Sequence, residues 1–238
     1  MSLARRSAAS LLVLASLGLA ACSGSSDATS AGSSAGSGAS AASEVRLGYF
    51  PNVTHAVPIV ADKEGLFAKH LGGSTLKIST FNAGPAAMEA LKSGAIDATY
   101  VGPGPATNAF INSQGEAIRI VSGAATGGAA LVVDPSITSV AQLKGKKVAT
   151  PQLGNTQDVA LRFYLKEQGL TTDLQGGGDV NITPQENSQI LDSFSQKLIA
   201  GAWVPEPYAT RLVQAGGKVL VDEQDVVAGH IDTVARGR

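Results

Sequence analysis

From residue 45 onward the chain repeats one local pattern: a short apolar or alternating run, a loop rich in Pro, Gly, Asn or Gln, then a helical pattern. The expected strands of these units are 45–50, 76–81, 96–101, 146–150, 180–183 and 201–204. Strands alternating with helices are typical of α/β folds, because a parallel strand pair needs a crossover long enough to hold a helix. We therefore predict an α/β fold with mostly parallel sheets.

The units group as three plus three, which predicts two similar lobes. Two internal similarities support this grouping. Residues 96–107 align without gaps to 199–210, so that Tyr100 matches Trp203. The second similarity relates Ala-Thr-Pro-Gln at 149–152 to Ile-Thr-Pro-Gln at 182–185. Further strand-like runs at 118–124 and 130–133 complete the pattern, and the predicted lobes are 45–133 and 134–221, joined through 130–136.

The N-terminus has the order of a secretory signal. Arg5 and Arg6 precede a short apolar stretch, which ends in small residues before Cys22, the chain's one cysteine. Leu19 to Cys22 resembles a bacterial lipoprotein signal, in which the thiol is lipidated, for example with palmitate. A free thiol in an ordinary signal peptide is the alternative. We expect a signal peptide at 1–21, then at 22–44 a lipidated cysteine and a flexible Ser/Gly/Ala tether.

The loops that follow the expected strands are rich in neutral hydrogen-bonding side chains and almost free of Lys and Arg. In open α/β sheets, ligands bind beyond the carboxyl ends of the strands, so a cleft between the lobes is the expected site. Helix N-termini at these loops attract anions. Asn155 is expected to cap one helix, and Gly84 and Thr54 two others, with ordinary capping as the alternative to binding. The predicted ligand is a small oxyanion.

Other functions find little support in the sequence. The net charge of −1 and pI near 6.3 do not favour nucleic-acid binding. The histidines are His55, His70 and His230, and the sequence holds no HExxH, Walker, GxSxG or CxxC motif. We expect no metal, no cofactor and no enzymatic activity. Trp203, Pro205, Glu206 and Pro207 form a rigid turn. Glu206 is a candidate catalytic acid, but we interpret it as a cleft or hinge contact.

Five segments together carry a family resemblance: LGYFPNVTHA, FNAGPAAMEALKSGAIDATYVGPGPA, GGAALVV, LKGKKVATPQLGNTQDVALR and GAWVPEPYATRL. They closely resemble the ABC-transporter substrate-binding lipoproteins of the aliphatic sulfonate, nitrate and taurine group, in order, over about 45–225. The resemblance implies the type II periplasmic-binding-protein fold, with two α/β lobes that close on ligand. It also implies a monomer, exported and lipid-anchored at the outer face of the membrane, that delivers solute to a permease driven by a cytoplasmic ATPase.

Position by position, the resemblance implies ligand loops at 52–55, 82–84, 102–104, 152–157 and 203–206. With the loop donors, the candidate substrate-binding residues are Asn52, Thr54, His55, Asn82, Ala83, Gly84, Gly102, Pro103, Gly104, Gln152, Gly154, Asn155, Thr156, Gln157, Gln185, Trp203 and Glu206. Trp203 is expected to form an apolar wall. The pattern is most similar to that of the sulfonate binders. Nitrate, taurine or bicarbonate binders, an enzyme on the same fold of the pyrimidine-synthesis type, and a sensor or adhesion lipoprotein are the alternatives.

The chain departs from the family pattern after residue 223. Relatives cross back to the first lobe and continue with several helices, whereas this chain has DVVAGHIDTVARGR. Residues 222–238 are interpreted as a truncated return segment, with no helix or strand expected from 230 onward. We expect a first lobe that is incomplete at the C-terminus and exposes apolar sheet surface.

Overall fold

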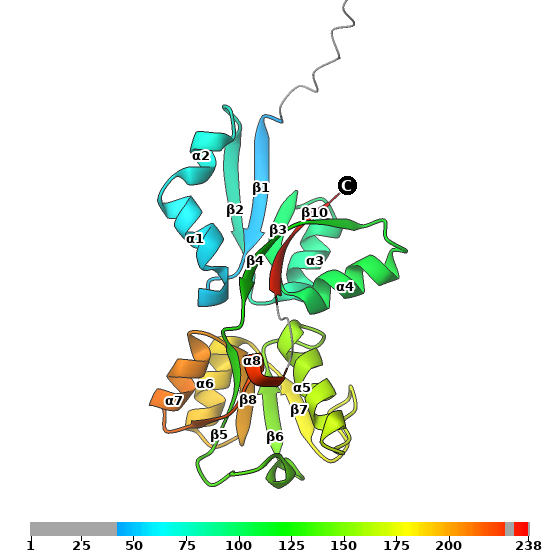
Figure 1. Ribbon diagram of the computed structural model, residues 1–238, viewed down its shortest axis with the longest axis vertical. Coiled ribbons are helices and arrows are strands. Elements are labelled where there is room, and N and C mark those ends of the chain that lie inside the picture. Colours follow the sequence, from blue (N-terminus) through cyan, green and yellow to red (C-terminus); the bar gives the residue numbers. More distant parts are fainter. Residues whose placement is uncertain (1–41, 227–230, 238) are drawn as a thin grey trace, which may run out of the picture. The chain divides into compact units, whose positions relative to one another are not determined.

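The computed structural model describes residues 42–226 and 231–237. In them the chain forms two five-stranded sheets with helices packed against them (Figure 1). The expected signal peptide, Cys22 and nearly all of the tether lie outside the described residues. Among the residues that are described, none of the helices has the length and apolar character needed to cross a membrane.

The first sheet has the strand order β2-β1-β3-β10-β4. Its strands are β1 (Glu44–Tyr49), β2 (Thr75–Thr80), β3 (Ala98–Val101), β4 (Ile118–Thr126) and β10 (Ile231–Gly237). Its helical segments are the 3₁₀ turn η1 (Val53–His55), α1 (Ala56–Lys63), α2 (Leu66–His70), α3 (Gly84–Lys92) and α4 (Pro103–Asn112). β1 is parallel to β2 and β3, whereas β10 is antiparallel to β3 and β4.

The second sheet has the equivalent order, β7-β6-β8-β5-β9. Its strands are β5 (Ala129–Val133), β6 (Lys147–Thr150), β7 (Asn181–Pro184), β8 (Gly201–Pro205) and β9 (Lys218–Asp222). Its helical segments are η2 (Val140–Leu143), α5 (Thr156–Glu167), α6 (Asn187–Ser195), α7 (Tyr208–Gln214) and α8 (Glu223–Val226). β6 is parallel to β7 and β8, and β5 is antiparallel to β8 and β9.

Each sheet contains one inner strand, β10 in the first and β5 in the second, that is antiparallel to both of its neighbours. β5 belongs to the second sheet, so the second lobe begins at Ala129 and not at 134 as predicted. β10 lies between β3 and β4, so the chain returns to the first lobe as expected. The prediction that 230–238 contains no strand is wrong for Ile231–Gly237. Backbone pairing with a neighbour on both sides stabilises a strand that its composition alone does not indicate.

The internal similarity between 96–107 and 199–210 corresponds to equivalent places in the two sheets. Ala98 pairs with Leu47 of β1, and Gly201 pairs with Val148 of β6. The gapless alignment matches Ala98 with Gly201. The two halves therefore share one register, and their loops leave the two sheets at corresponding strand ends.

β5 shows how the core of the second lobe is built. All five of its residues, AALVV, are buried, as expected for a continuous apolar strand covered on both faces. Because strand side chains alternate between faces, Leu131 packs in the cluster that contains Leu161 of α5. Val132 packs on the opposite face with Ile190 of α6 and Leu212 of α7. One strand thus joins the helices of both faces into one lobe.

Gly201 lies where β8 begins, close against β5. A Cβ at this position would lie 2.6 Å from the carbonyl oxygen of Val132 and 2.7 Å from Cγ1 of Val133. Gly201→Ala is expected to lower the free energy of unfolding by about 1–3 kcal/mol, because a backbone contact cannot be relieved by a rotamer change. Urea unfolding measures this loss. The control Ser188→Ala, on the exposed surface of α6, is expected to stay within about 0.5 kcal/mol of wild type; a G201A curve that overlays the wild-type curve would contradict the packing described.

Candidate functional site

A cavity lies where the loops after β1, β2, β3, β6, β7 and β8 meet. Its lining residues are Phe50, Asn52, Thr54, His55, Asn82, Ala83, Gly84, Gly102, Pro151, Asn155, Thr156, Gln157, Asn187 and Pro205. The sequence predicted ten of these; Phe50, Pro151, Asn187 and Pro205 were missed. The repeat of 149–152 at 182–185 contained a signal for Asn187, because it places this residue near the position of Asn155. The cavity thus lies at the strand ends where the fold class predicts a ligand.

Helix α5 presents its N-terminus to this cavity, and its cap is the one predicted. The Asn155 Oδ1 atom accepts a hydrogen bond of 2.8 Å from the backbone N–H of Asp158. The Asn155 Nδ2 atom then donates to Oε1 of Gln157 at 3.0 Å. Since the Gln157 oxygen is engaged, the group that this side chain can offer to a ligand is its NH₂ donor. The linked amides of Asn155 and Gln157 therefore place a donor group at the cavity wall.

The other predicted caps are wrong. Ala83, not Gly84, is the N-cap of α3, and Pro85 is the second helical residue. Gly84 has a packing role, because a Cβ there would lie 2.2 Å from Cγ of Pro105 in α4. Thr54 lies inside η1 and donates its hydroxyl to Oδ1 of Asn52 at 2.8 Å. Glycine thus allows α3 and α4 to start close together at the cavity.

His55 is almost fully buried at the cavity wall, with 1% of its surface exposed. Its Nδ1 atom accepts the backbone N–H of Phe50 at 3.1 Å, and the two rings stack at a centroid distance of 4.1 Å. An Nδ1 atom that accepts a hydrogen bond carries no proton, so the ring's proton is on Nε2. This bond favours a neutral imidazole, which is a donor at Nε2 and adds no charge to the site.

Asn82 connects the two sheets at the cavity. Its Nδ2 atom donates to the carbonyl oxygen of Pro151 at 3.0 Å. Its Oδ1 atom accepts from the backbone N–H and from Nδ2 of Asn187, at 3.4 and 3.3 Å. A second connection joins the N–H of Val53 to the carbonyl oxygen of Glu206 at 3.0 Å. The Asn82 amide is therefore committed to loops of the second lobe, which holds the cavity closed.

The structure does not bring Trp203 to the cavity. Trp203 is fully buried in the core of the second lobe, where its ring meets Tyr164 edge-on at a centroid distance of 5.7 Å. Its Nε1 atom donates to Oε2 of Glu223 at 3.2 Å. The prediction that Trp203 forms an apolar wall of the site is wrong, because alternation along β8 turns this side chain onto the face covered by α5.

The carboxylate of Glu206 likewise lies outside the set of cavity-lining residues. It accepts hydrogen bonds from the backbone N–H and the hydroxyl of Thr210, at 3.1 and 2.9 Å. The side chain thus caps the first turn of α7. The backbone carbonyl oxygen of Glu206, and not its carboxylate, accepts the N–H of Val53 from the first lobe.

The remaining predicted residues surround the cavity without lining it. Pro103 and Gly104 begin α4, and a Cβ on Gly104 would lie 3.2 Å from Cα of Thr156. The Gly154 N–H donates to the Asp158 carboxylate at 2.9 Å. Gln152 and Gln185 line an adjoining open groove instead. In that groove Gln185 also accepts the Ser193 hydroxyl at 2.7 Å.

Size and charge distinguish the cavity from the groove. The cavity volume is about 20 Å³, roughly the space of one water-sized group. The groove measures about 590 Å³ and is lined by Thr80, Phe81, Asn82, Ala86, Pro151, Gln152, Leu153, Pro184, Gln185, Glu186 and Gln189. The two share Asn82 and Pro151, so they are neighbours. None of the cavity-lining residues is Lys, Arg, Asp or Glu, and no cluster of three metal-ligating side chains occurs among the described residues.

Comparison with known proteins shows the family to which the chain belongs. Residues 38–236 match the profile of the NMT1-like family. The chain belongs to this family. A protein of Brucella abortus (strain 2308), whose name assigns it only as a binding protein, is 31% identical over 172 residues, or 68% of this chain and 48% of the relative. The taurine-binding periplasmic protein of Escherichia coli (strain K12) is 28% identical over 70% of this chain and 50% of its own.

Solved structures show the same fold. The periplasmic aliphatic sulphonate-binding protein of Escherichia coli has a TM-score of 0.65 and 26% identity, over 83% of this chain and 66% of that one. The nitrate-binding protein of Synechocystis PCC 6803 has a TM-score of 0.69 and 16% identity, over 82% and 55%. The fold is that of the type II periplasmic binding proteins, as predicted. The chain spans about half the length of the curated relatives it matches.

Asn82 provides a test of how the cavity is kept closed. Asn82→Ala removes the side-chain bonds to Pro151 and Asn187 without changing either core, so it is expected to favour an open cleft by about 1–2 kcal/mol. Small-angle X-ray scattering of the protein is expected to show a larger radius of gyration at an unchanged melting temperature. Asn112→Ala, which removes an exposed amide bonded to Asn108, is the control. An unchanged scattering curve for N82A would show that these bonds do not hold the lobes together.

Proposed function

We propose that the protein is the non-enzymatic solute-binding component of an ABC importer and that it captures a small organic oxyanion, an aliphatic sulfonate, in the cavity between the lobes. The supporting observation is the cavity's lining of neutral donors around the N-terminus of α5, without a carboxylate. A sulfonate is a permanent anion with three acceptor oxygens, which suits donors that carry no charge. The family and the fold agree with this class of protein.

The strength of such a site follows from the hydrogen bonds it can make. Each bond to a charged group contributes about 1.5–3 kcal/mol. Five or six such bonds would provide the roughly 8 kcal/mol of a micromolar complex after the costs of association. Asn52, His55, Asn155, Thr156 and Gln157 lie along the cavity wall and can supply them.

The adjoining groove favours an organic ligand over an inorganic one. The cavity accepts only a small head group, whereas the groove beside it is open and has both apolar and amide lining. An alkyl chain that leaves the head group past Asn82 and Pro151 would lie against Phe81, Ala86 and Leu153. Nitrate or bicarbonate would leave the groove unused. These two small anions are the second candidates, because the cavity itself is small.

The importer role implies further partners. We propose a membrane permease, with its cytoplasmic ATPase, as the acceptor of the solute. We also propose that the protein acts as a monomer, exported and anchored through a lipid on Cys22 at the outer face of the membrane. The support is the order of charged, apolar and small residues before Cys22, followed by the Ser/Gly/Ala-rich stretch. Mass spectrometry of membrane-extracted protein would detect the lipid.

Calorimetric titration tests the ligand. Wild-type protein is titrated with methanesulfonate, pentanesulfonate, taurine, nitrate and bicarbonate, and sulfonate binding is expected. Gln157→Leu removes one donor and is expected to weaken sulfonate binding by about tenfold to a hundredfold. Gln168→Leu, the same substitution at the exposed opposite end of α5, is the control. Binding of nitrate but no sulfonate would replace the proposed ligand, and silence toward all five would refute an oxyanion site.

A substitution in the groove separates the head group from the chain. Ala86 is exposed on α3 and lines the groove. Ala86→Trp is expected to fill the groove, so pentanesulfonate binds about tenfold more weakly while methanesulfonate binds as in wild type. Competition titration with both ligands measures the ratio. Equal effects on the two ligands would show that the alkyl chain does not occupy the groove.

A further inference from the structure

We propose that Arg162 and Asp158 are positioning residues for the oxyanion. In this inference, which rests on the proposed function, Asp158 holds the N-terminal loop of α5 in its donor-presenting shape. Arg162 cancels the negative charge that Asp158 brings to the site. Neither residue lines the cavity, and neither was singled out from the sequence as a ligand contact.

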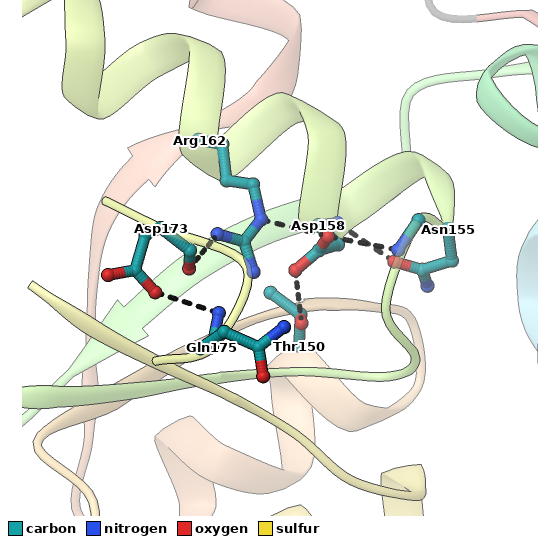
Figure 2. Close-up of polar contacts among 7 residues, drawn as sticks. Thr150, Asn155, Asp158, Arg162, Asp173 and Gln175 are labelled. Atoms are coloured by element: carbon teal, nitrogen blue, oxygen red, sulfur yellow. Dashed lines mark hydrogen bonds and ion pairs between the residues drawn. The ribbon is translucent and has the colours of Figure 1, made fainter. Parts of the chain in front are cut away.

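Asp158 connects the end of β6, the following loop and the first turn of α5 (Figure 2). Its carboxylate accepts the Thr150 hydroxyl at 3.0 Å and the Gly154 N–H at 2.9 Å. Its backbone N–H donates to Oδ1 of Asn155 at 2.8 Å. These three bonds fix both ends of the segment 150–155. They also fix the Asn155 amide, which in turn engages Gln157.

This arrangement creates an electrostatic conflict. A carboxylate in the first turn of a helix is favourable toward the helix dipole, but it repels an anion that binds at the same helix end. Asp158 is 1% exposed, so water screens its charge little. An oxyanion at Asn155 and Gln157 would therefore meet a buried negative charge one turn away, unless a cation compensates it.

Arg162 is that cation. It lies one turn further along α5, and its Nε atom is 3.0 Å from Oδ2 of Asp158. Its Nη1 atom donates to the carbonyl oxygen of Asp173 at 2.8 Å, which holds the guanidinium in place (Figure 2). Among the described residues its buried Nη2 atom has no hydrogen-bond partner. The guanidinium therefore makes fewer hydrogen bonds than it could. We attribute the choice of arginine at this position to its positive charge next to Asp158.

The test compares two substitutions of Arg162 that differ in charge. Arg162→Met keeps the length of the side chain and removes the charge, whereas Arg162→Lys keeps the charge and loses the fork to Asp173. We expect R162M to bind the oxyanion that wild type binds about tenfold more weakly. This is the repulsion from the uncompensated charge of Asp158, roughly 10 Å from the ligand at an effective dielectric constant of about 20. R162K is expected to bind within about threefold of wild type, although both variants melt at lower temperature.

Two further variants complete the design. Asp158→Asn combined with R162M removes both charges and is expected to bind the oxyanion more tightly than R162M alone, because no unpaired negative charge is left behind the loop. Lys166→Met removes an exposed cation from the same helix and is the control for general charge effects. Calorimetric titration is done well below each melting temperature, so that affinity and stability are measured separately. If R162M does not fold, a loss of binding in R162K, which keeps the charge, would still overturn the inference.

The outcomes distinguish this inference from the proposed function. Weak binding by R162M with recovery in R162K and in the double variant supports charge compensation. Equal loss of affinity in R162M and R162K would overturn it in favour of packing alone. Unchanged affinity in R162M would also overturn it. The proposed oxyanion site would still stand in that case, as long as the wild-type protein binds the anion. If wild type binds none of the five anions, the proposed function fails first and this inference fails with it.

Discussion

The return of the chain from the second lobe to the first, where β10 pairs inside the first sheet, is the constraint on which the site depends. β5 follows β4 after only Gly127 and Gly128, both with positive φ, and then pairs in the second sheet. β10 comes from the far end of the chain and pairs in the first sheet. Because β10 follows the second lobe in the chain but pairs in the first sheet, the chain crosses between the lobes twice. The loops of both halves are thereby brought to one cavity.

The register shared by the two sheets determines which loops meet. Strands β1, β2 and β3 have their equivalents in β6, β7 and β8, and all six lead into the polar loops around the cavity. The bonds of Asn82 to Pro151 and Asn187 join an early loop of one lobe to two loops of the other. A backbone that places helix starts on opposite sides of one space can therefore build a site from neutral donors alone.

Much of this arrangement could be predicted from the sequence, because it follows from local periodicity. Local periodicity was enough to predict the strand–loop–helix units, the cap at Asn155 and most of the loops that line the cavity. β10 could not be predicted, since its pairing partners β3 and β4 are far away in the chain. Trp203 lies in the strand that was expected at 201–204, but an apolar GAWV run does not show which side chains of a strand buried on both faces turn toward the site. Asp158 and Arg162 are four residues apart on α5, so their contact follows from helix geometry, whereas the bonds of Asp158 to Thr150 and Gly154 depend on the loop shape that the structure displays.

Under the proposed function, the position of the cations bears on how the site would bind an anion and still release it. No Lys or Arg lines the cavity, and Arg162 is paired with the buried carboxylate of Asp158 behind the loop. A cation in direct contact would strengthen binding of every anion with little regard to its shape. Oriented amides and a neutral His55 instead depend on the directions of the ligand's acceptor oxygens. An importer's binding protein must give up its solute when the lobes open, and donors contributed by two lobes are separated by that same motion.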